Sequence, residues 1–214
     1  MFRKLVLLML GLSLMLTACG KPNVENEALT HIRLPMGYIP NIQYAPFYVA
    51  VEKGYFADAG IEIEFDYSFE TKGVELVAAG ELPFAVVSGE QVLLARAKGL
   101  PVTYIAAWYQ QYPVSVVAKS EAGILVPQDL KGKKIGLPGL FGANYIGLRA
   151  LLNAGKLTEA DVTLDAIGFN QVELMAAGQQ DIVVGYAANE PIQLRAQGIA
   201  VTELRVAGYA QLAA

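Results

Sequence analysis

VELVAAG, at residues 74–80, recurs 98 residues later as VELMAAG, at residues 172–178. Each copy resembles the end of a helix, because a glycine directly after an apolar helical stretch is a common stop signal. Each is followed by a short apolar run, at residues 84–87 and 182–184, that predicts a strand leading into a polar loop. The repeat predicts two similar units in two lobes, with strand ends that face each other across a cleft. A chance similarity between two alanine-rich helices is the alternative.

Strands and helices alternate along the rest of the chain. The apolar runs that predict strands lie at residues 32–36, 61–67, 84–87, 102–107, 114–118, 134–136, 182–185 and 201–205. The helical stretches, each with a glycine at or near its end, lie at residues 45–53, 74–79, 91–98, 143–153, 172–177 and 191–196. Such alternation with short links predicts an α/β fold.

The segment at residues 121–136 is polar and rich in turn-forming residues, and we interpret it as the entry to the second lobe. The predicted division of the chain is a signal peptide at residues 1–18, a tether at 19–31, a first lobe at 32–118 and a second lobe at 119–214.

The N-terminus has the pattern of a secretory signal. Arg3 and Lys4 precede an apolar run of about a dozen residues, shorter than the roughly 20 that span a bilayer. The following LTAC, at residues 16–19, resembles the lipobox of bacterial lipoproteins. This resemblance implies lipidation of Cys19 and a lipid-anchored protein on the extracytoplasmic face of the cell membrane. A lone buried thiol is the alternative interpretation of Cys19.

The composition argues against several functions. Without Arg3 and Lys4, 14 basic residues face 20 acidic ones, which gives a formal charge of −6 and no basic block, so we expect no nucleic-acid partner. Cys19 is the only cysteine and His31 the only histidine, so we expect no disulfide, no metal site and no cofactor. His31 is interpreted as a solvated residue of the tether. A Ser-His-Asp triad would require this histidine, so we expect no such triad. The sequence also lacks a P-loop and a dinucleotide fingerprint.

Aromatic side chains gather near the ends of predicted strands. A planar ligand stacks on such rings, and each contact contributes about 0.5–1.5 kcal/mol beyond burial. The candidates for a stacking site are Tyr38, Tyr44, Trp108, Tyr109, Phe141 and Tyr145. Part of the aromatic set must belong to the core, and Tyr104 is the member least expected in the site.

Polar candidates lie at the starts of predicted helices. They are Asn41, Ser88, Gly89, Asn189 and Glu190, with Tyr186 close to the last two. Helix capping alone explains Asn41 and Ser88, but a helix start can also offer free backbone N–H groups to a ligand. Glu190 has two interpretations: it complements the helix dipole, or it accepts hydrogen bonds from a ligand in the cleft.

Four stretches of the chain resemble a known family. They are GYIPNIQYAPFYVAVEKGYFADAGIEIEF at residues 37–65, VAAGELPFAVVSGEQ at 77–91, LKGKKIGLPG at 130–139 and VGYAANEP at 184–191. The chain resembles the substrate-binding proteins that share a domain with thiamine-pyrimidine synthases and with nitrate, sulfonate and taurine receptors. This resemblance implies a type II periplasmic-binding-protein fold, in which two lobes close over a ligand and deliver it to an ABC permease.

Within this family, VGYAANEP is most similar to members that bind riboflavin or pyrimidine precursors of thiamine. The resemblance implies a non-enzymatic receptor for an aromatic nitrogen heterocycle. The alternatives are a nitrate- or sulfonate-type anion receptor, a purely structural lipoprotein, and an iron-dependent pyrimidine synthase. The synthase would require His31 and a cysteine-rich motif that this sequence lacks. Family members are substantially longer, so we expect the chain to be a fragment with an incomplete second lobe.

Overall fold

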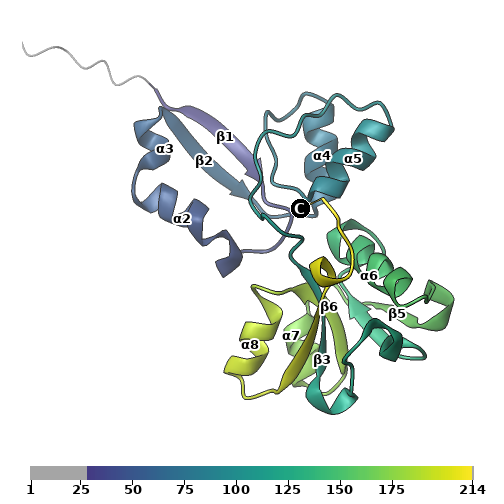
Figure 1. Cartoon of the computed structure of the whole chain (residues 1–214). Coiled ribbons are helices and arrows are strands. Elements are labelled where there is room, and N and C mark those ends of the chain that lie inside the picture. Colours follow the sequence, from purple (N-terminus) through teal and green to yellow (C-terminus); the bar gives the residue numbers. More distant parts are fainter. Residues whose placement is uncertain (1–27, 214) are drawn as a thin grey trace, which may run out of the picture.

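The computed structural model describes residues 28–213. The predicted signal peptide, the lipidation site Cys19 and most of the predicted tether therefore lie outside the described residues. Among residues 28–213, no helix combines the length and the apolar character needed to cross a bilayer. Figure 1 shows two lobes, one with strands β1 and β2 and the other with strands β3, β5 and β6.

The first lobe is built around two parallel strands, β1 (Thr30–Pro35) and β2 (Ile61–Asp66). The connection between them contains η1 (Ile42–Tyr44), α2 (Ala45–Glu52) and α3 (Tyr55–Asp58). Helices α4 (Glu70–Ala78) and α5 (Gly89–Ala97) follow. The predicted tether is wrong at its C-terminal end, because His31 lies within β1 and pairs with Glu62 of β2.

The second lobe is built around a sheet of five strands in the order β5-β4-β6-β3-β7. Its strands are β3 (Val114–Lys119), β4 (Lys134–Leu137), β5 (Thr163–Ala166), β6 (Ile182–Tyr186) and β7 (Val201–Arg205). Its longer helices are α6 (Gly142–Ala154), α7 (Gln171–Ala176) and α8 (Glu190–Ala196). The single turns are η2 (Ser120–Ala122), η3 (Pro127–Leu130), η4 (Glu159–Asp161) and η5 (Val206–Gly208). β4 runs parallel to β5 and β6, whereas β3 runs antiparallel to β6 and β7.

Strand β3 belongs to the second lobe in the structure, although the sequence places residues 114–118 at the end of the first. Its apolar run VSVVA lies between β6 and β7 and is buried along its length. A run that is apolar on both faces is typical of a central strand covered on both sides. The chain therefore enters the second lobe before Val114, and residues 121–136 lie inside that lobe.

Two runs predicted as strands, at residues 84–87 and 102–107, are irregular in the structure. The Val86 N–H donates to the Pro35 carbonyl at 2.8 Å, so the first run lies beside the end of β1. The Val102 N–H bonds locally, to the Leu100 carbonyl at 2.9 Å. An apolar run becomes a strand only where a neighbouring backbone pairs along it, and neither run has such a ladder within the described residues.

The helical half of the predicted repeat is confirmed. Gly80 and Gly178 follow α4 and α7, and both take the left-handed conformation, with φ of +73° and +72°. Glycine adopts this conformation without the steric penalty of a side chain, which explains why both helices stop there. The strand half is confirmed only in the second lobe, where α7 leads into β6.

Candidate ligand-binding cleft

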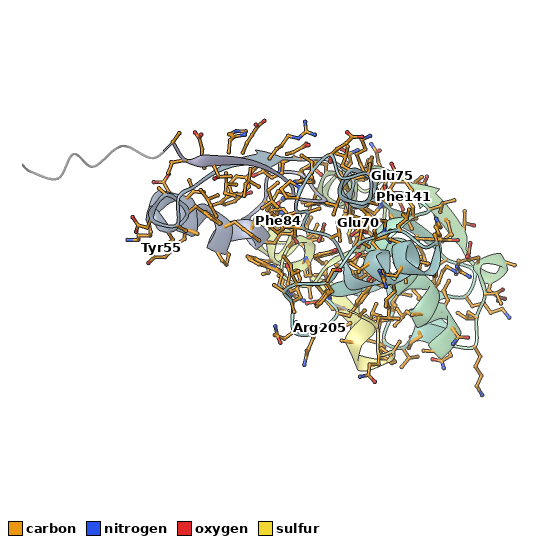
Figure 2. All side chains as sticks on the ribbon, turned by 90° about the horizontal axis from the view of Figure 1, so that it is seen from above. Tyr55, Glu70, Glu75, Phe84, Phe141 and Arg205 are labelled. Carbon is orange, nitrogen blue, oxygen red and sulfur yellow. The ribbon has the colours of Figure 1, made fainter. Side chains whose placement is uncertain are left out.

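A cavity of about 470 Å³ lies between the lobes and is lined by residues from both. Its volume falls within the range of about 300–1,000 Å³ that is typical of small-molecule sites. Figure 2 shows Glu70 and Phe141 together near the middle of the molecule, while Tyr55 lies toward the far end of the first lobe. The cavity thus occupies the place where the sequence predicts a cleft.

Most of the predicted site residues line this cavity. They are Tyr38, Tyr44, Ser88, Trp108, Tyr109, Phe141, Tyr186, Asn189 and Glu190. Tyr104, the aromatic residue least expected in the site, also lines it. The strand-end loops and helix starts singled out in the sequence therefore do converge.

Three predicted site residues do not line the cavity: Asn41, Gly89 and Tyr145. Gly89 is buried at the start of α5, behind Ser88. The Tyr145 hydroxyl donates to Glu159 at 2.8 Å, on the other side of α6. Successive helical residues are turned by about 100°, so Asn144 faces the cavity while Tyr145 faces away.

The walls of the cavity are aromatic. The Phe47 and Trp108 rings are stacked, with centroids 4.4 Å apart. Other ring pairs join the two lobes at centroid distances of 4.5–5.1 Å: Tyr38 with Phe169, Phe69 with Phe141, and Phe69 with Phe169. Phe47, Phe69 and Phe169 are not among the predicted site residues, because nothing in their local sequence shows that they meet rings far away in the chain.

Glu190 is the most deeply buried charged group of the cavity, with 2% of its surface exposed. Its Oε1 accepts a hydrogen bond from the Tyr38 hydroxyl of the first lobe at 3.2 Å, and its Oε2 accepts one from the Tyr186 N–H at 2.7 Å. A Cβ on Gly185 would lie 2.5 Å from this carboxyl group, so only glycine permits its position. Burial raises the pKa of Glu190, and the hydrogen bond from the Tyr186 N–H lowers it.

Asn41 and Asn189 form a second link between the lobes. The Asn41 amide donates from Nδ2 to Oδ1 of Asn189 at 2.9 Å. Its Oδ1 accepts from the Gln43 N–H at 3.0 Å, so Asn41 also caps η1, as its sequence position predicts. Asn41 thus supports the cavity from outside by holding Asn189 in place.

Glu70 lines the cavity but is not among the site residues predicted from the sequence. Its Oε2 accepts hydrogen bonds from the Ser88 N–H at 2.9 Å and the Ser88 hydroxyl at 2.6 Å. Its Oε1 accepts one from the Ala143 N–H at 2.7 Å. The carboxylate therefore joins the start of α5 in the first lobe to the start of α6 in the second. An acidic residue in the first turn of a helix is common, so the local sequence does not signal these distant partners.

Glu90 lies behind the cavity, in a buried chain of hydrogen bonds between the lobes. The Tyr112 hydroxyl is 2.9 Å from Glu90 Oε1 and 2.8 Å from the Ala143 carbonyl. A hydroxyl has one hydrogen and a carbonyl only accepts, so both contacts are satisfied when a protonated Glu90 donates to Tyr112. Burial raises the pKa of Glu90, which favours this protonated form.

The charge of the cavity is one-sided. Among the described residues that line it, the acidic side chains are Glu70 and Glu190, and no lysine, arginine or histidine is present. His31 lies elsewhere on β1: its imidazole is about half exposed and lies 3.3 Å from Glu64. Ile32 and Leu34, the neighbours of His31 and Arg33 on the opposite face of β1, line the cavity instead.

Residues 41–213 match the protein family described as NMT1/THI5 like. The chain is 45% identical over 201 residues to the riboflavin-binding protein RibY of Chloroflexus aurantiacus. These residues make up 92% of this chain and 57% of that protein. It is 29% identical over 187 residues to the formylaminopyrimidine-binding protein of Halalkalibacterium halodurans. These residues make up 87% of this chain and 56% of that protein. The chain thus spans little more than half the length of these relatives.

Synthases are also among the similar proteins. The 4-amino-5-hydroxymethyl-2-methylpyrimidine phosphate synthase THI13 of Saccharomyces cerevisiae is 28% identical over 161 residues, which covers 74% of this chain and 47% of that protein. The fold is similar to that of the alkanesulfonate-binding protein SsuA from Xanthomonas axonopodis pv. citri, with a TM-score of 0.56, 19% identity, and coverage of 82% of this chain and 60% of that one. This likeness confirms the predicted α/β periplasmic-binding-protein fold.

Proposed function

The chain belongs to the NMT1/THI5-like family, and on this premise we propose that it is the solute-binding subunit of an ABC importer. Its ligand is an uncharged aromatic nitrogen heterocycle of the riboflavin or thiamine-pyrimidine type. The observation that carries this proposal is the lining of the cavity, which combines aromatic rings from both lobes with two carboxylates and no basic side chain among the described residues. The 45% identity to the riboflavin-binding protein RibY makes riboflavin the first compound to test.

Each part of the lining has a role in this proposal. The rings of Tyr38, Tyr44, Trp108 and Phe141 stack on a planar heterocycle, and each pair contributes about 0.5–1.5 kcal/mol beyond burial. The Glu190 carboxylate accepts a hydrogen bond from a ring N–H. Its two protein donors leave lone pairs free, since an ionised carboxylate offers about four acceptor positions.

Capture requires the lobes to open and close around the ligand. Tyr38 with Glu190 and Asn41 with Asn189 join the two lobes directly at the cavity. A ligand that contacts both lobes binds the closed form more tightly, so its binding energy shifts the population toward that form. The closed form then docks on an ABC permease, and the lipid on Cys19 keeps the receptor at the extracytoplasmic face of the membrane.

A nitrate- or sulfonate-type receptor is a poorer match to this cavity. A buried anion requires a cation or several free N–H donors to offset its desolvation. The described lining supplies no basic side chain, and the N–H groups of Ser88 and Ala143 already donate to Glu70.

The residues present also do not fit an iron-dependent synthase. His31 points away from the cavity and contacts Glu64 on the exposed side of β1. Within residues 28–213, no three histidine, cysteine, aspartate or glutamate side chains are grouped so that they could hold a metal ion. We therefore propose binding without turnover, and we assign no step to iron.

Thermal unfolding of the purified protein with riboflavin, thiamine, nitrate and taurine tests the proposal. A ligand at about a hundredfold its Kd adds about 2.7 kcal/mol to the free energy of unfolding. We expect this stabilisation with a heterocycle and none with nitrate or taurine. Stabilisation by an anion alone, or by no compound, would overturn the proposal.

Glu190→Gln identifies the group that orients the ligand. The change removes a charged acceptor that contributes about 1.5–3 kcal/mol, so the heterocycle should bind about tenfold to a hundredfold more weakly. Glu75→Gln on the exposed side of α4 is the matched control and should leave the affinity unchanged.

A further inference from the structure

Glu70 holds the starts of two helices that come from different lobes. Ser88, which donates to Oε2, is the N-cap residue of α5, and Ala143, which donates to Oε1, is the second residue of α6. The first N–H groups of a helix have no partner within the helix, and the aligned peptide dipoles place partial positive charge there. The Glu70 carboxylate thus receives three hydrogen bonds at a point toward which two positive helix ends are directed.

The surroundings of Glu70 are shaped for this contact. Gly142, the first residue of α6, has a φ of +73°, and a Cβ at this position would lie 2.7 Å from Glu70 Oε1. A glycine is therefore required both by the backbone conformation and by the close approach of the carboxylate. The main chain of α6 and the side chain of Glu70 fit each other at one place on the cavity wall.

This place has the chemistry of an anion site, and a residue of the protein already occupies it. Two helix starts with free N–H groups form a common binding arrangement for phosphate, sulfate and carboxylate groups. Here those donors face the cavity, but their acceptor is covalently attached to α4. A free anion would have to displace Glu70 or lie beside its negative charge in a medium of low dielectric constant.

We propose that Glu70 determines the charge selectivity of the cavity by acting as an internal anion. Its carboxylate occupies the position that an anionic ligand would take at the starts of α5 and α6, and this excludes anionic ligands from the cavity. The inference rests on the proposed function, because it explains why a heterocycle rather than an anion is bound. It extends that function by naming Glu70 as the residue that discriminates against anions, which compete with the heterocycle for the cavity.

A purely structural role for Glu70 makes a different prediction. If the carboxylate only joins the lobes, its removal lowers stability and creates no new binding site. If it is an internal anion, Glu70→Ala leaves three donors free at an open position, and the variant acquires affinity for small carboxylates. The gain of anion binding is therefore the decisive measurement.

The experiment measures the thermal unfolding of the full chain in acetate and in chloride at equal ionic strength. The variants are Glu70→Ala, Glu70→Gln and Glu75→Ala, which removes the same charge from the exposed side of α4. At an acetate concentration tenfold above its Kd, we expect the Tm of Glu70→Ala to rise by about 3–6 °C. The wild type and Glu75→Ala should show no such rise. Glu70→Gln should show none either, because its amide fills the space.

Ligand selectivity provides an independent readout. The wild type should bind riboflavin at least about a hundredfold more tightly than riboflavin phosphate, since the phosphate finds no cation in the cavity. In Glu70→Ala this ratio should fall at least about tenfold, while Glu75→Ala keeps it. Glu70→Asp retains the charge and should retain the ratio.

Each outcome decides a different point. Acetate stabilisation that is absent from Glu70→Ala, or equal in all variants, overturns the inference even if riboflavin binds. Acetate stabilisation confined to Glu70→Ala supports the inference even if riboflavin fails to bind, in which case the proposed function is wrong. If Glu70→Ala is unfolded in chloride, refolding in acetate supports the inference. If it is unfolded in both salts, an unchanged ligand ratio in Glu70→Gln, which lacks the charge, overturns the inference.

Discussion

Strand β3 in the second lobe is buried at five of its six residues, whereas β2 in the first lobe has no buried residue. Helices α2 and α3 of the first lobe also bury no residue, while α6 of the second lobe buries six. The apolar side chains Ile61 and Ile63 of β2 line the cavity, and Ile63 also packs against the small cluster of Leu34, Met36 and Tyr44. The second lobe therefore has the larger buried core, whereas the clusters described in the first lobe are small.

The largest expected effect of a single substitution is in the core of the second lobe. Leu151 on α6 is fully buried in the main apolar cluster, so Leu151→Ala should reduce the free energy of unfolding by about 2–5 kcal/mol. Leu76→Ala on α4 of the first lobe is the matched comparison, and it should have a smaller effect because Leu76 is 8% exposed and lies outside the apolar clusters. Urea unfolding measures both. A larger loss for Leu76→Ala would contradict the difference between the lobes.

The junction of the lobes should give the next largest effect. Gly142→Ala and Gly178→Ala both place a side chain at a φ near +73°, which costs about 1–2 kcal/mol. Only Gly142→Ala also pushes a Cβ into the Glu70 carboxylate, whereas Gly178 has open space. Gly142→Ala should therefore lose at least about 1.5 kcal/mol more, the smaller value for a hydrogen bond to a charged group. Equal losses in urea unfolding would show that Glu70 does not stabilise the junction.

A third prediction concerns the pH dependence of the same junction. Because burial raises the pKa of Glu90 in the folded state, the unfolded chain binds fewer protons as pH rises from the unfolded pKa through the folded pKa. Glu90 therefore contributes stability at low pH that is lost across this window. Glu90→Gln keeps a donor for Tyr112 and removes the ionisation.

The measurement is the free energy of unfolding of both proteins from pH 4 to pH 8. The Glu90→Gln variant should be less pH-sensitive than the wild type and should gain relative stability as pH rises. Glu75→Gln, exposed on α4, is the control and should follow the wild type. A wild-type advantage that grows with pH would show that Glu90 is ionised in the folded protein.

The contrast between the lobes also explains which features the sequence could predict. Helices, their glycine ends and the loop with Asn189 and Glu190 depend on neighbours in the chain, so local patterns reveal them. The partners of β3 and the contacts of Glu70 with Ser88 and Ala143 depend on segments far away in the chain. Local apolar patterns cannot show which backbone pairs with a strand, and this also explains the irregular runs at 84–87 and 102–107.

The smallest expected effect is at His31, on the outer face of the first lobe. Its imidazole lies 3.3 Å from the Glu64 carboxylate with both side chains more than half accessible, and even charged pairs at such exposed positions contribute only about 0–1 kcal/mol. His31→Ala should therefore change the free energy of unfolding by less than about 1 kcal/mol and leave riboflavin affinity unchanged. Glu64→Ala is the control for this contact alone and should give the same stability. If His31→Ala, but not Glu64→Ala, lost ligand binding or stopped forming a chemical product, this histidine would act at the cavity. That result would favour the synthase interpretation over a receptor.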